Sequence, residues 1–387
     1  MNPFVAAEAC FRAHCAGRLG VGAGLCLWTG DGPVLSLADG WRERQQATPW
    51  ACSTLAPVWS ATKGPASAAL LHALAAHGLD PDTPAGRVWP RLGPRLTLGQ
   101  LMSHQAGLAA LDREADASDP AAVATALEAQ APAWLPPDHG YHPRTFGFLV
   151  DELVRRITGA PNLGTYWHEA IARPHGIDFW IGLPPEEDGR VARLVPGPAE
   201  VPPGETGFYE AFRNPATLTH RAFQSPRGFF SAAEMNQPAA WRAGLAGFGG
   251  LGSAEGLAKF YFLLGTDALL GSAAAPWLRV RRADGPDRIL LMPTAFSCGF
   301  MLDPLDGAGR KLRASLGAAR DAFGHPGAGG SLGFFDPAQR LGFGYVPNRM
   351  GLGVLPGRRT QALVRAACGG ALCRRDNQWT RTGFRAK

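Results

Sequence analysis

The first part of the chain combines a helical repeat with two extended apolar segments. In residues 3–18, apolar side chains recur three and four positions apart, which predicts an amphipathic helix. Residues 22–28 and 33–41 are apolar segments on either side of a turn that contains Gly30 and Gly32, a pattern typical of a β-hairpin. The chain is therefore expected to begin with a helix followed by two antiparallel strands.

Helical periodicity dominates the middle of the chain. A helix is predicted from residue 59 to 77, because Gly78 directly after it supplies the usual C-terminal stop. The following part, 97–175, keeps a helical pattern, with predicted helices at 98–104, 121–129 and 146–158. Residues 182–252 are rich in proline, glycine and aromatic residues and have little periodicity. This segment is either a functional covering segment or partly structured.

Strand patterns return near the C-terminus, which suggests how the chain is organised. The predicted elements are a helix at 253–264, strands at 295–302, 330–335 and 340–347, and a last helix at 359–371. Strands towards both ends with helices between them predict one α/β unit of the α+β type over residues 1–387. Residues 1–75 and 240–387 would form its α/β part, and residues 76–239 its helical part, including the long loop 182–240.

Composition favours a globular protein that acts away from membranes. Apolar residues make up 46% of the 387 residues and charged residues 18%, which suits a buried core. No apolar run reaches the roughly 18 residues that a membrane span needs. Glu8 and Arg12 interrupt the apolar N-terminal residues, unlike in a signal peptide. We therefore expect a cytoplasmic protein.

The positive charge does not indicate a nucleic-acid partner. The net charge is +6, but only four of the 38 basic residues are lysines, and the arginines are scattered apart from a basic C-terminal tail. No basic stripe with interleaved aromatic residues accompanies them. The seven cysteines form no CxxC pair, and His139 and His142 lack a second pair that would complete a metal site. Neither a metal nor an organic cofactor is expected.

Ser60-Ala61-Thr62-Lys63, at the start of the predicted second helix, is the strongest chemical signal. Residues three positions apart share a helix face, so the Lys63 amine can lie beside the Ser60 hydroxyl and assist its deprotonation. Ser60 in the first turn also lies near the positive end of the helix dipole, which favours a developing oxyanion. The alternative interpretation is a helix-capping serine beside a solvated lysine.

Further motifs resemble the serine β-lactamase and penicillin-binding-protein family, in particular the carboxylesterases related to class C β-lactamases. The matching segments are Ser60-x-x-Lys63 within residues 58–64, LGQLMSHQAGL at 98–108, which is similar to the family's LLSHTSGL, Gly140-Tyr141-His142 followed by 145–147, and the strand motif at 323–330. They occur in the family's order over most of the chain, whereas residues 182–240 have no clear counterpart. The resemblance implies a β-lactamase-like fold, with an antiparallel sheet flanked by the terminal helices and a mostly helical middle region.

The resemblance also implies an acyl-enzyme mechanism. Tyr141 would accept the proton of Ser60 together with Lys63, provided that nearby positive charge lowers the pKa of Tyr141 from about 10. The backbone N–H groups of Ser60 and Ala328 would form the oxyanion hole. No metal takes part in such a mechanism.

Two departures from the class C β-lactamase pattern affect the expected substrate. Pro143 stands where those enzymes have an asparagine that holds the antibiotic's amide, and proline has no side-chain donor. His325 replaces the lysine that begins their strand motif, and a histidine with the reference pKa of ~6.5 is largely neutral at pH 7. Gly327 and its neighbouring glycines would let substrate approach the strand edge. Because Pro143 and His325 remove the two groups that would recognise an anionic, amide-bearing ligand, a small neutral ester is the expected substrate.

Two competing motifs are rejected. Residues 329–333 satisfy the GxSxG nucleophile elbow around Ser331, but α/β-hydrolases place a histidine after the serine, and the last histidine here is His325. Ser118-Asp119-Pro120 resembles the SDN element of class A β-lactamases but lacks the asparagine, and it is interpreted as a helix N-terminus. His104 lies in a segment that the family uses structurally, and it is interpreted as a core histidine.

The expected activity is that of a serine hydrolase, a carboxylesterase that cleaves small neutral esters through an acyl-enzyme on Ser60. A β-lactamase, a D-amino-acid peptidase or an acyltransferase could use the same acyl-enzyme with another substrate or nucleophile. A catalytically idle scaffold of this fold is the remaining alternative. The intact set of Ser60, Lys63 and Tyr141 argues against that alternative.

Overall fold

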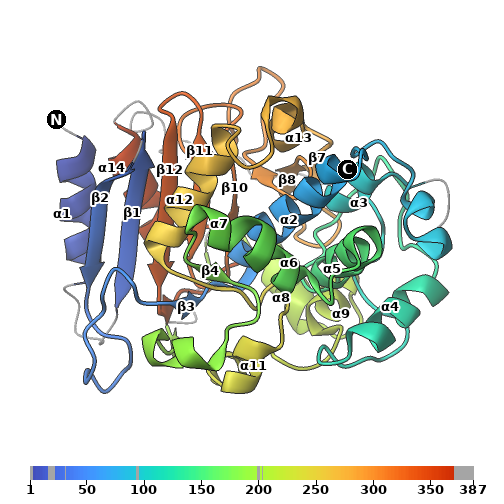
Figure 1. Ribbon diagram of the computed structural model, residues 1–387, viewed down its shortest axis with the longest axis horizontal. Coiled ribbons are helices and arrows are strands. Elements are labelled where there is room, and N and C mark those ends of the chain that lie inside the picture. The colour runs from blue at the N-terminus through green and yellow to red at the C-terminus, as the bar shows by residue number, and fades with distance from the viewer. Residues whose placement is uncertain are drawn as a thin grey trace.

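An eight-stranded antiparallel sheet with helices on both faces stands beside a mostly helical layer (Figure 1). The computed structural model describes residues 3–15, 22–30, 32–92, 96–197, 201–202 and 204–369. Within these ranges, no helix combines the length and the apolar character needed to cross a bilayer. The α+β class predicted from the sequence is confirmed.

Strands from both ends of the chain build the large sheet. Its order is β2-β1-β12-β11-β10-β9-β8-β7, and each neighbouring pair is antiparallel. Two small sheets join β3-β6-β4 and, in parallel, β13-β5. The strands are β1 (Ala23–Thr29), β2 (Gly32–Asp39), β3 (Ala56–Pro57), β4 (Phe179–Trp180), β5 (Val195–Pro196), β6 (Leu251–Gly252), β7 (Ala283–Pro286), β8 (Pro293–Phe296), β9 (Met301–Leu302), β10 (Phe323–Pro326), β11 (Leu332–Asp336), β12 (Leu341–Pro347) and β13 (Arg349–Met350).

The alternating sequence of β12 explains how helices cover both faces of the sheet. Gly342 and Gly344 face α12, and a Cβ atom at Gly344 would lie 2.1 Å from the backbone oxygen of Ala254. Only glycine allows this close approach of helix and strand. Phe343, between the two glycines, is buried on the opposite face in one cluster with residues of α1 and α14. These three helices are α1 (Pro3–Cys15), α12 (Ala254–Gly265) and α14 (Arg358–Cys368).

The helical layer contains most of the remaining helices. The predicted helix at 59–77 is confirmed as a short 3-10 helix, η1 (Trp59–Thr62), that continues into α2 (Lys63–Ala76). The other helices are η2 (Ala85–Arg87), η3 (Pro90–Leu92), α3 (Leu98–Met102), α4 (Pro120–Ala129), α5 (Thr145–Thr158), α6 (Leu163–Tyr166), the π-helical η4 (Trp167–Ala172), α7 (Arg173–His175), η5 (Pro185–Arg190), α8 (Thr206–Arg213), α9 (Leu218–Gln224), α10 (Ala232–Met235), α11 (Pro238–Arg242), η6 (Ser272–Ala274) and α13 (Ala275–Arg279). Because α8 to α11 lie in the segment 182–252, that segment is partly structured.

Some predicted elements differ in the structure. The strand expected at 295–302 is instead the two antiparallel strands β8 and β9, because the chain reverses at Gly299, whose φ is 82°. The N–H of Ser297 closes this turn by donating to the oxygen of Phe300. Strand β7 was not predicted, since its sequence ADGP carries no apolar alternation. Parts of the predicted end helices, residues 16–18 and 370–371, lie outside the described residues.

Helix α2 lies between the sheet and the helical layer (Figure 1), and η1 directly precedes it in the chain. It packs against α5 on one side and β10 on the other, and most of its residues are buried. The N–H of Val58, just before η1, donates to the oxygen of Gly250 at 3.0 Å. The residues of η1 therefore lie where the end of β10, the helical layer and the segment before β6 meet.

Candidate active site

Ser60 lies in a strained turn at the start of η1. Trp59, the residue before it, has a φ of 49°, a left-handed conformation that is uncommon for a bulky side chain. Strained residues of this kind cluster at functional sites. Ser60 is the second residue of η1, at a helix start where backbone N–H groups lack acceptors within the helix. Its N–H is therefore suited to bind an oxyanion.

Lys63 lies fully buried beside Ser60. Its Nζ is 3.3 Å from Ser60 Oγ, 2.8 Å from the backbone oxygen of Pro143 and 2.7 Å from that of Gly247. Burial, and to a smaller extent the positive charge of Arg144, holds the pKa of Lys63 well below its usual value of 10.5. Both effects favour the neutral amine.

A neutral Lys63 amine matches its three partners. A neutral amine has two N–H donors and one lone pair, whereas an ammonium group has three donors and no acceptor. The two backbone oxygens of Pro143 and Gly247 take the two N–H groups, which leaves the lone pair for the Ser60 hydroxyl. Lys63 can therefore accept the proton of Ser60.

Tyr141 contacts the same serine from the loop before α5. Its hydroxyl is hydrogen-bonded to Ser60, and Lys63 Nζ lies 4.9 Å from the centroid of its ring. Burial raises the pKa of Tyr141 above its usual value of 10; the Ser60 hydrogen bond opposes this increase, and the nearby Asp287 adds to it. The expected lowering of the pKa of Tyr141 is therefore wrong for the resting protein, because loss of hydration outweighs the favourable contacts. A protonated Tyr141 can donate a proton instead.

Asp287, in the turn between β7 and β8, holds the Tyr141 loop. Its carboxylate oxygens accept the N–H of Tyr141 at 3.0 and 3.1 Å, and Oδ2 accepts the Thr294 hydroxyl at 2.9 Å. Oδ1 also accepts the N–H groups of Ile289 and Leu290, each at 2.8 Å. All of these groups donate to the carboxylate, which fixes the position of the Tyr141 backbone relative to β7 and β8.

Of the two neighbouring residues Ala328 and Gly327, the first lies at the Ser60 cavity and the second packs against η1. Ala328 borders the same cavity as Ser60, and no described residue accepts a hydrogen bond from its N–H. A Cβ atom at Gly327 would lie 2.0 Å from the backbone oxygen of Val58 and 3.1 Å from the nitrogen of Ala61. Close packing of the end of β10 against η1 therefore explains the glycine at 327 without any contact to substrate.

His325 is buried beside the Tyr141 ring, with the ring centroids 6.0 Å apart, and is not among the residues that line the cavity. The Nδ1 of His325 is 2.7 Å from the backbone oxygen of Pro326, and burial together with Lys63 lowers the pKa of His325 to about 3. The expected neutral state of this histidine is confirmed. Pro143 borders the cavity, and its carbonyl oxygen is one of the two that hold Lys63.

The residues of the rejected motifs have structural roles. The Ser331 hydroxyl is buried and donates to the backbone oxygen of Val58 at 2.8 Å. Asp119 caps α4 by accepting the N–H of Ala122 at 3.0 Å. His104 is fully buried, and its Nδ1 accepts the N–H of His142 at 3.1 Å. It also packs edge-on against the Tyr141 ring, as expected of a core histidine behind the site.

A cavity of about 300 Å³ opens at Ser60 and contains a residue that was not anticipated. Arg144 lines this cavity and is 5% exposed, and burial lowers its pKa to about 9. Arg144 lies three positions after Tyr141, and nothing in the sequence around it indicated a role in the site. Gly247 and Asp287 were also missed: the former acts through its backbone oxygen, and the latter is an isolated acidic residue in a hairpin.

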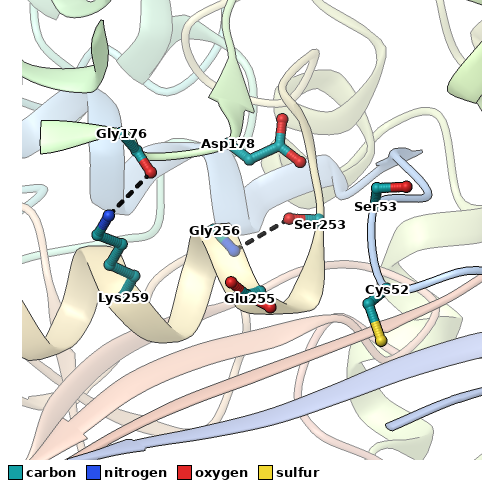
Figure 2. A pocket seen from close by; sticks show the side chains of 8 residues that line it. All are labelled: Cys52, Ser53, Gly176, Asp178, Ser253, Glu255, Gly256 and Lys259. Atoms are coloured by element: carbon teal, nitrogen blue, oxygen red, sulfur yellow. Dashed lines mark hydrogen bonds between the residues drawn. The ribbon is translucent and has the colours of Figure 1, made fainter. Parts of the chain in front are cut away.

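A second cavity of about 220 Å³ lies at the start of α12 and shares no lining residue with the first (Figure 2). Lys259 donates there to the oxygen of Gly176 at 3.1 Å, and the Ser253 side chain accepts the N–H of Gly256 at 3.0 Å. These polar groups hold the loop and the helix start in place. The cavity at Ser60 is therefore the better candidate for catalysis.

Comparison with known proteins identifies the family. The sequence profile of the Beta-lactamase family matches residues 8–367. The chain belongs to the β-lactamase family. Membership confirms the resemblance inferred from Ser60-x-x-Lys63, the tyrosine motif and the strand motif.

Relatives within the β-lactamase family include esterases. The chain is 30% identical over 356 residues to the Esterase/beta-lactamase LipL of Mycobacterium tuberculosis, covering 87% of this chain and 79% of LipL. A penicillin-binding protein homologue from Caulobacter crescentus and a family VIII carboxylesterase are each 29% identical, with a TM-score of 0.81. Both structures match 95% of this chain and 97% of their own. The predicted β-lactamase-like fold is confirmed.

Proposed function

We propose that this serine hydrolase cleaves small neutral esters through an acyl-enzyme on Ser60. The observation that carries the proposal is the hydrogen bonding of Lys63, whose two N–H groups are taken by backbone oxygens while its Nζ lies 3.3 Å from Ser60 Oγ. This arrangement leaves a base beside the nucleophile. The names of the relatives, an esterase/β-lactamase and a family VIII carboxylesterase, support ester hydrolysis.

Acylation begins with proton transfer from the Ser60 hydroxyl to Lys63 Nζ while Ser60 Oγ attacks the ester carbonyl. The N–H groups of Ser60 and Ala328 bind the oxyanion, and each donor of this kind typically contributes about 2.7–4 kcal/mol to transition-state stabilisation. When the carbon–oxygen bond of the leaving alcohol breaks, Tyr141 gives its proton to the alkoxide. The raised pKa of Tyr141 keeps that proton in place until this step.

In deacylation the same two groups, Tyr141 and Lys63, transfer protons in the opposite direction. After acylation, Tyr141 is a tyrosinate and Lys63 an ammonium group, so the net charge of the pair is unchanged. Tyr141 then accepts a proton from the attacking water, and Lys63 returns its proton to Ser60 Oγ as the acyl–serine bond breaks. The tyrosine therefore acts as a base only after its proton has been used.

The polar groups around Ser60 favour a neutral ester over an anionic amide-bearing ligand. His325 is uncharged because burial and Lys63 lower its pKa to about 3. Pro143 has no side-chain donor, and its carbonyl is already occupied by Lys63. We keep a cytoplasmic location and the absence of a nucleic-acid partner as predictions from the sequence.

Covalent labelling tests the proposed nucleophile. Treatment with a fluorophosphonate, followed by intact-mass spectrometry and peptide mapping, should place one adduct on Ser60. Ser60→Ala should abolish both labelling and turnover, whereas Ser331→Ala should leave labelling at Ser60, because the Ser331 hydroxyl is donated to Val58. An adduct on the Ser331 peptide would contradict the proposal.

A β-lactamase is the second candidate, because the relative LipL carries that name together with esterase. The comparison is kcat/KM for p-nitrophenyl butyrate and for nitrocefin on the same preparation. We expect turnover of the ester and slow or negligible turnover of nitrocefin. A higher kcat/KM for nitrocefin would favour the β-lactamase.

A further inference from the structure

Helices within the segment 182–252 build one wall of the Ser60 cavity. Helices α8 and α9, yellow-green in Figure 1, pack against each other and supply several of its lining residues. The rings of Phe208, Phe212 and Phe223 form a triangle with centroid separations of 5.3–5.9 Å. Ring contacts at such distances stabilise a fixed aromatic surface. We call Phe208, Phe212 and Phe223 the aromatic wall.

The aromatic wall is anchored to the rest of the protein. The Thr219 hydroxyl of α9 donates to the oxygen of Ile289 at 2.8 Å, close to the Asp287 turn. The N–H of Leu111 donates to the Ser225 side chain at 2.9 Å. Phe208 is 2% exposed. The wall is therefore held from behind and is not a loose surface loop.

Much of the remaining lining of the cavity is also apolar. Residues 350–354 contribute Met350, Leu352 and Val354 beyond the end of β12. Among the described residues that line the cavity, Arg144 is the one with a charged side chain. Water that fills such a cavity gains little from its walls, so an apolar group of a ligand can displace it favourably.

Arg144 is engaged in holding the loop 226–230. It donates to the backbone oxygens of Pro226 at 3.0 Å and Phe229 at 3.3 Å, and also to that of Gly228. The rings of Phe230 and Phe248 lie with their centroids 4.5 and 4.3 Å from its guanidinium carbon. Backbone oxygens and ring faces therefore satisfy this cation, and we do not assign it as a counter-ion for a substrate carboxylate.

We infer that the cavity between the aromatic wall and residues 350–354 binds a neutral apolar substituent of the ester, either a phenyl ring or an alkyl chain of medium length. The inference rests on the proposed function and specifies its substrate class. Each methylene that enters the cavity should raise kcat/KM about fourfold until the cavity is full. Esters larger than acetate and butyrate are then the preferred substrates.

The test compares two series of substrates. The acyl series consists of p-nitrophenyl acetate, butyrate, hexanoate, octanoate and phenylacetate. The alcohol series consists of ethyl, butyl, hexyl and benzyl acetate, whose hydrolysis is measured by pH-stat titration. A rise in kcat/KM along the acyl series places the apolar group on the acyl side. A rise along the alcohol series places it on the leaving-group side, and either rise supports the inference.

Variants that fill the cavity test whether the rise in kcat/KM along a substrate series depends on this cavity. Gly351 borders the cavity, and a Cβ atom there would have no neighbour nearer than the Gly329 oxygen at 3.9 Å, so Gly351→Leu should add side-chain volume at the cavity without a clash at Cβ. The matched control is Gly207→Leu on the exposed face of α8, where a Cβ atom meets nothing within 4 Å. Gly351→Leu should lower the hexanoate-to-acetate ratio of kcat/KM about tenfold, and Gly207→Leu should leave the ratio unchanged.

Ala232→Leu, at another place in the lining, repeats the test if Gly351→Leu does not fold. Retained hydrolysis of p-nitrophenyl acetate shows in each case that the catalytic group is intact. Flat profiles in both substrate series, or an unchanged ratio in both filled variants, would overturn the inference. If acetate hydrolysis still depends on Ser60 in that case, the proposed function stands and only the apolar subsite fails.

Discussion

The backbone N–H of Tyr141 donates to both carboxylate oxygens of Asp287, at 3.0 and 3.1 Å. The two residues are far apart in sequence, yet this contact decides where the Tyr141 hydroxyl lies relative to Ser60. A carboxylate can accept all the N–H and O–H groups that surround Asp287. An amide side chain would present its own donors to some of them.

Asp287→Asn should therefore weaken catalysis by displacing Tyr141. We expect kcat/KM to fall about tenfold or more and the free energy of unfolding to fall by about 1–3 kcal/mol, the usual cost of leaving a buried polar group unpaired. Esterase assays and urea denaturation measure the two effects. Asp284→Asn in the same hairpin, where Asp284 pairs with the partly exposed Arg281, is the control and should change little. Wild-type kcat/KM in Asp287→Asn would contradict the positioning role.

Arg144 should shift the acid limb of the pH profile of kcat/KM, because its charge adds to the effect of burial on the pKa of Lys63. Its positive charge lowers the pKa of Lys63, and catalysis requires the neutral amine, so kcat/KM should rise with pH through that pKa. Arg144→Met removes the charge and raises the pKa of Lys63, which moves the acid limb to higher pH. Nearby His142 and His325 do not interfere, because their pKa values are lowered to about 4 and about 3.

Arg144→Lys separates the charge of Arg144 from its grip on the loop. Lysine keeps the positive charge but cannot make the same set of hydrogen bonds to the oxygens of residues 226–229. The acid limb of the pH profile of Arg144→Lys should stay near that of the wild type even if the maximum kcat/KM falls. A limb that moves equally in Arg144→Met and Arg144→Lys would show that loop position, and not charge, controls Lys63.

Tyr141→Phe should harm poor leaving groups more than good ones. If Tyr141 protonates the departing alkoxide, its loss should slow alkyl acetates by orders of magnitude, while p-nitrophenolate, which leaves without a proton, should be affected less in acylation. Pre-steady-state release of p-nitrophenol isolates that acylation step. Equal losses for ethyl acetate and p-nitrophenyl acetate in acylation would argue against a proton donor.

Gly64, directly after Lys63, should not tolerate a side chain. A Cβ atom there would lie 2.2 Å from the Tyr261 hydroxyl oxygen, so Gly64→Ala requires the buried Tyr261 ring or one of the helices α2 and α12 to shift. Overpacking of this kind typically costs about 1–3 kcal/mol of stability. Adding Tyr261→Phe removes the hydroxyl and should recover part of the loss in a thermal or denaturant melt. Additive losses in the double variant would show that the contact is not the cause.

The local sequence determined the helices and strands in which residue types recur at a regular spacing. The alternation Leu341-Gly-Phe-Gly-Tyr345 predicts a strand, because side chains along a strand point to alternate faces. It also distinguishes the two faces, since one carries the glycines and the other the large apolar side chains. The spacing of Ser60 and Lys63 likewise places both on one side of a helix whatever surrounds it. The predicted hairpin, the helices at 59–77 and 253–264, and the Ser60–Lys63 contact follow from such short-range rules.

Only the tertiary structure decided the protonation state of the site. The acceptors of Lys63 are backbone oxygens of Pro143 and Gly247, 80 and 184 residues away, and every residue type carries such an oxygen. The sequence therefore contains no mark of this contact. The same holds for the pKa of Tyr141, which nearby positive charge such as that of Lys63 was expected to lower and which burial raises. Burial is a property of the packed chain, since it depends on how completely distant segments remove water from one side chain.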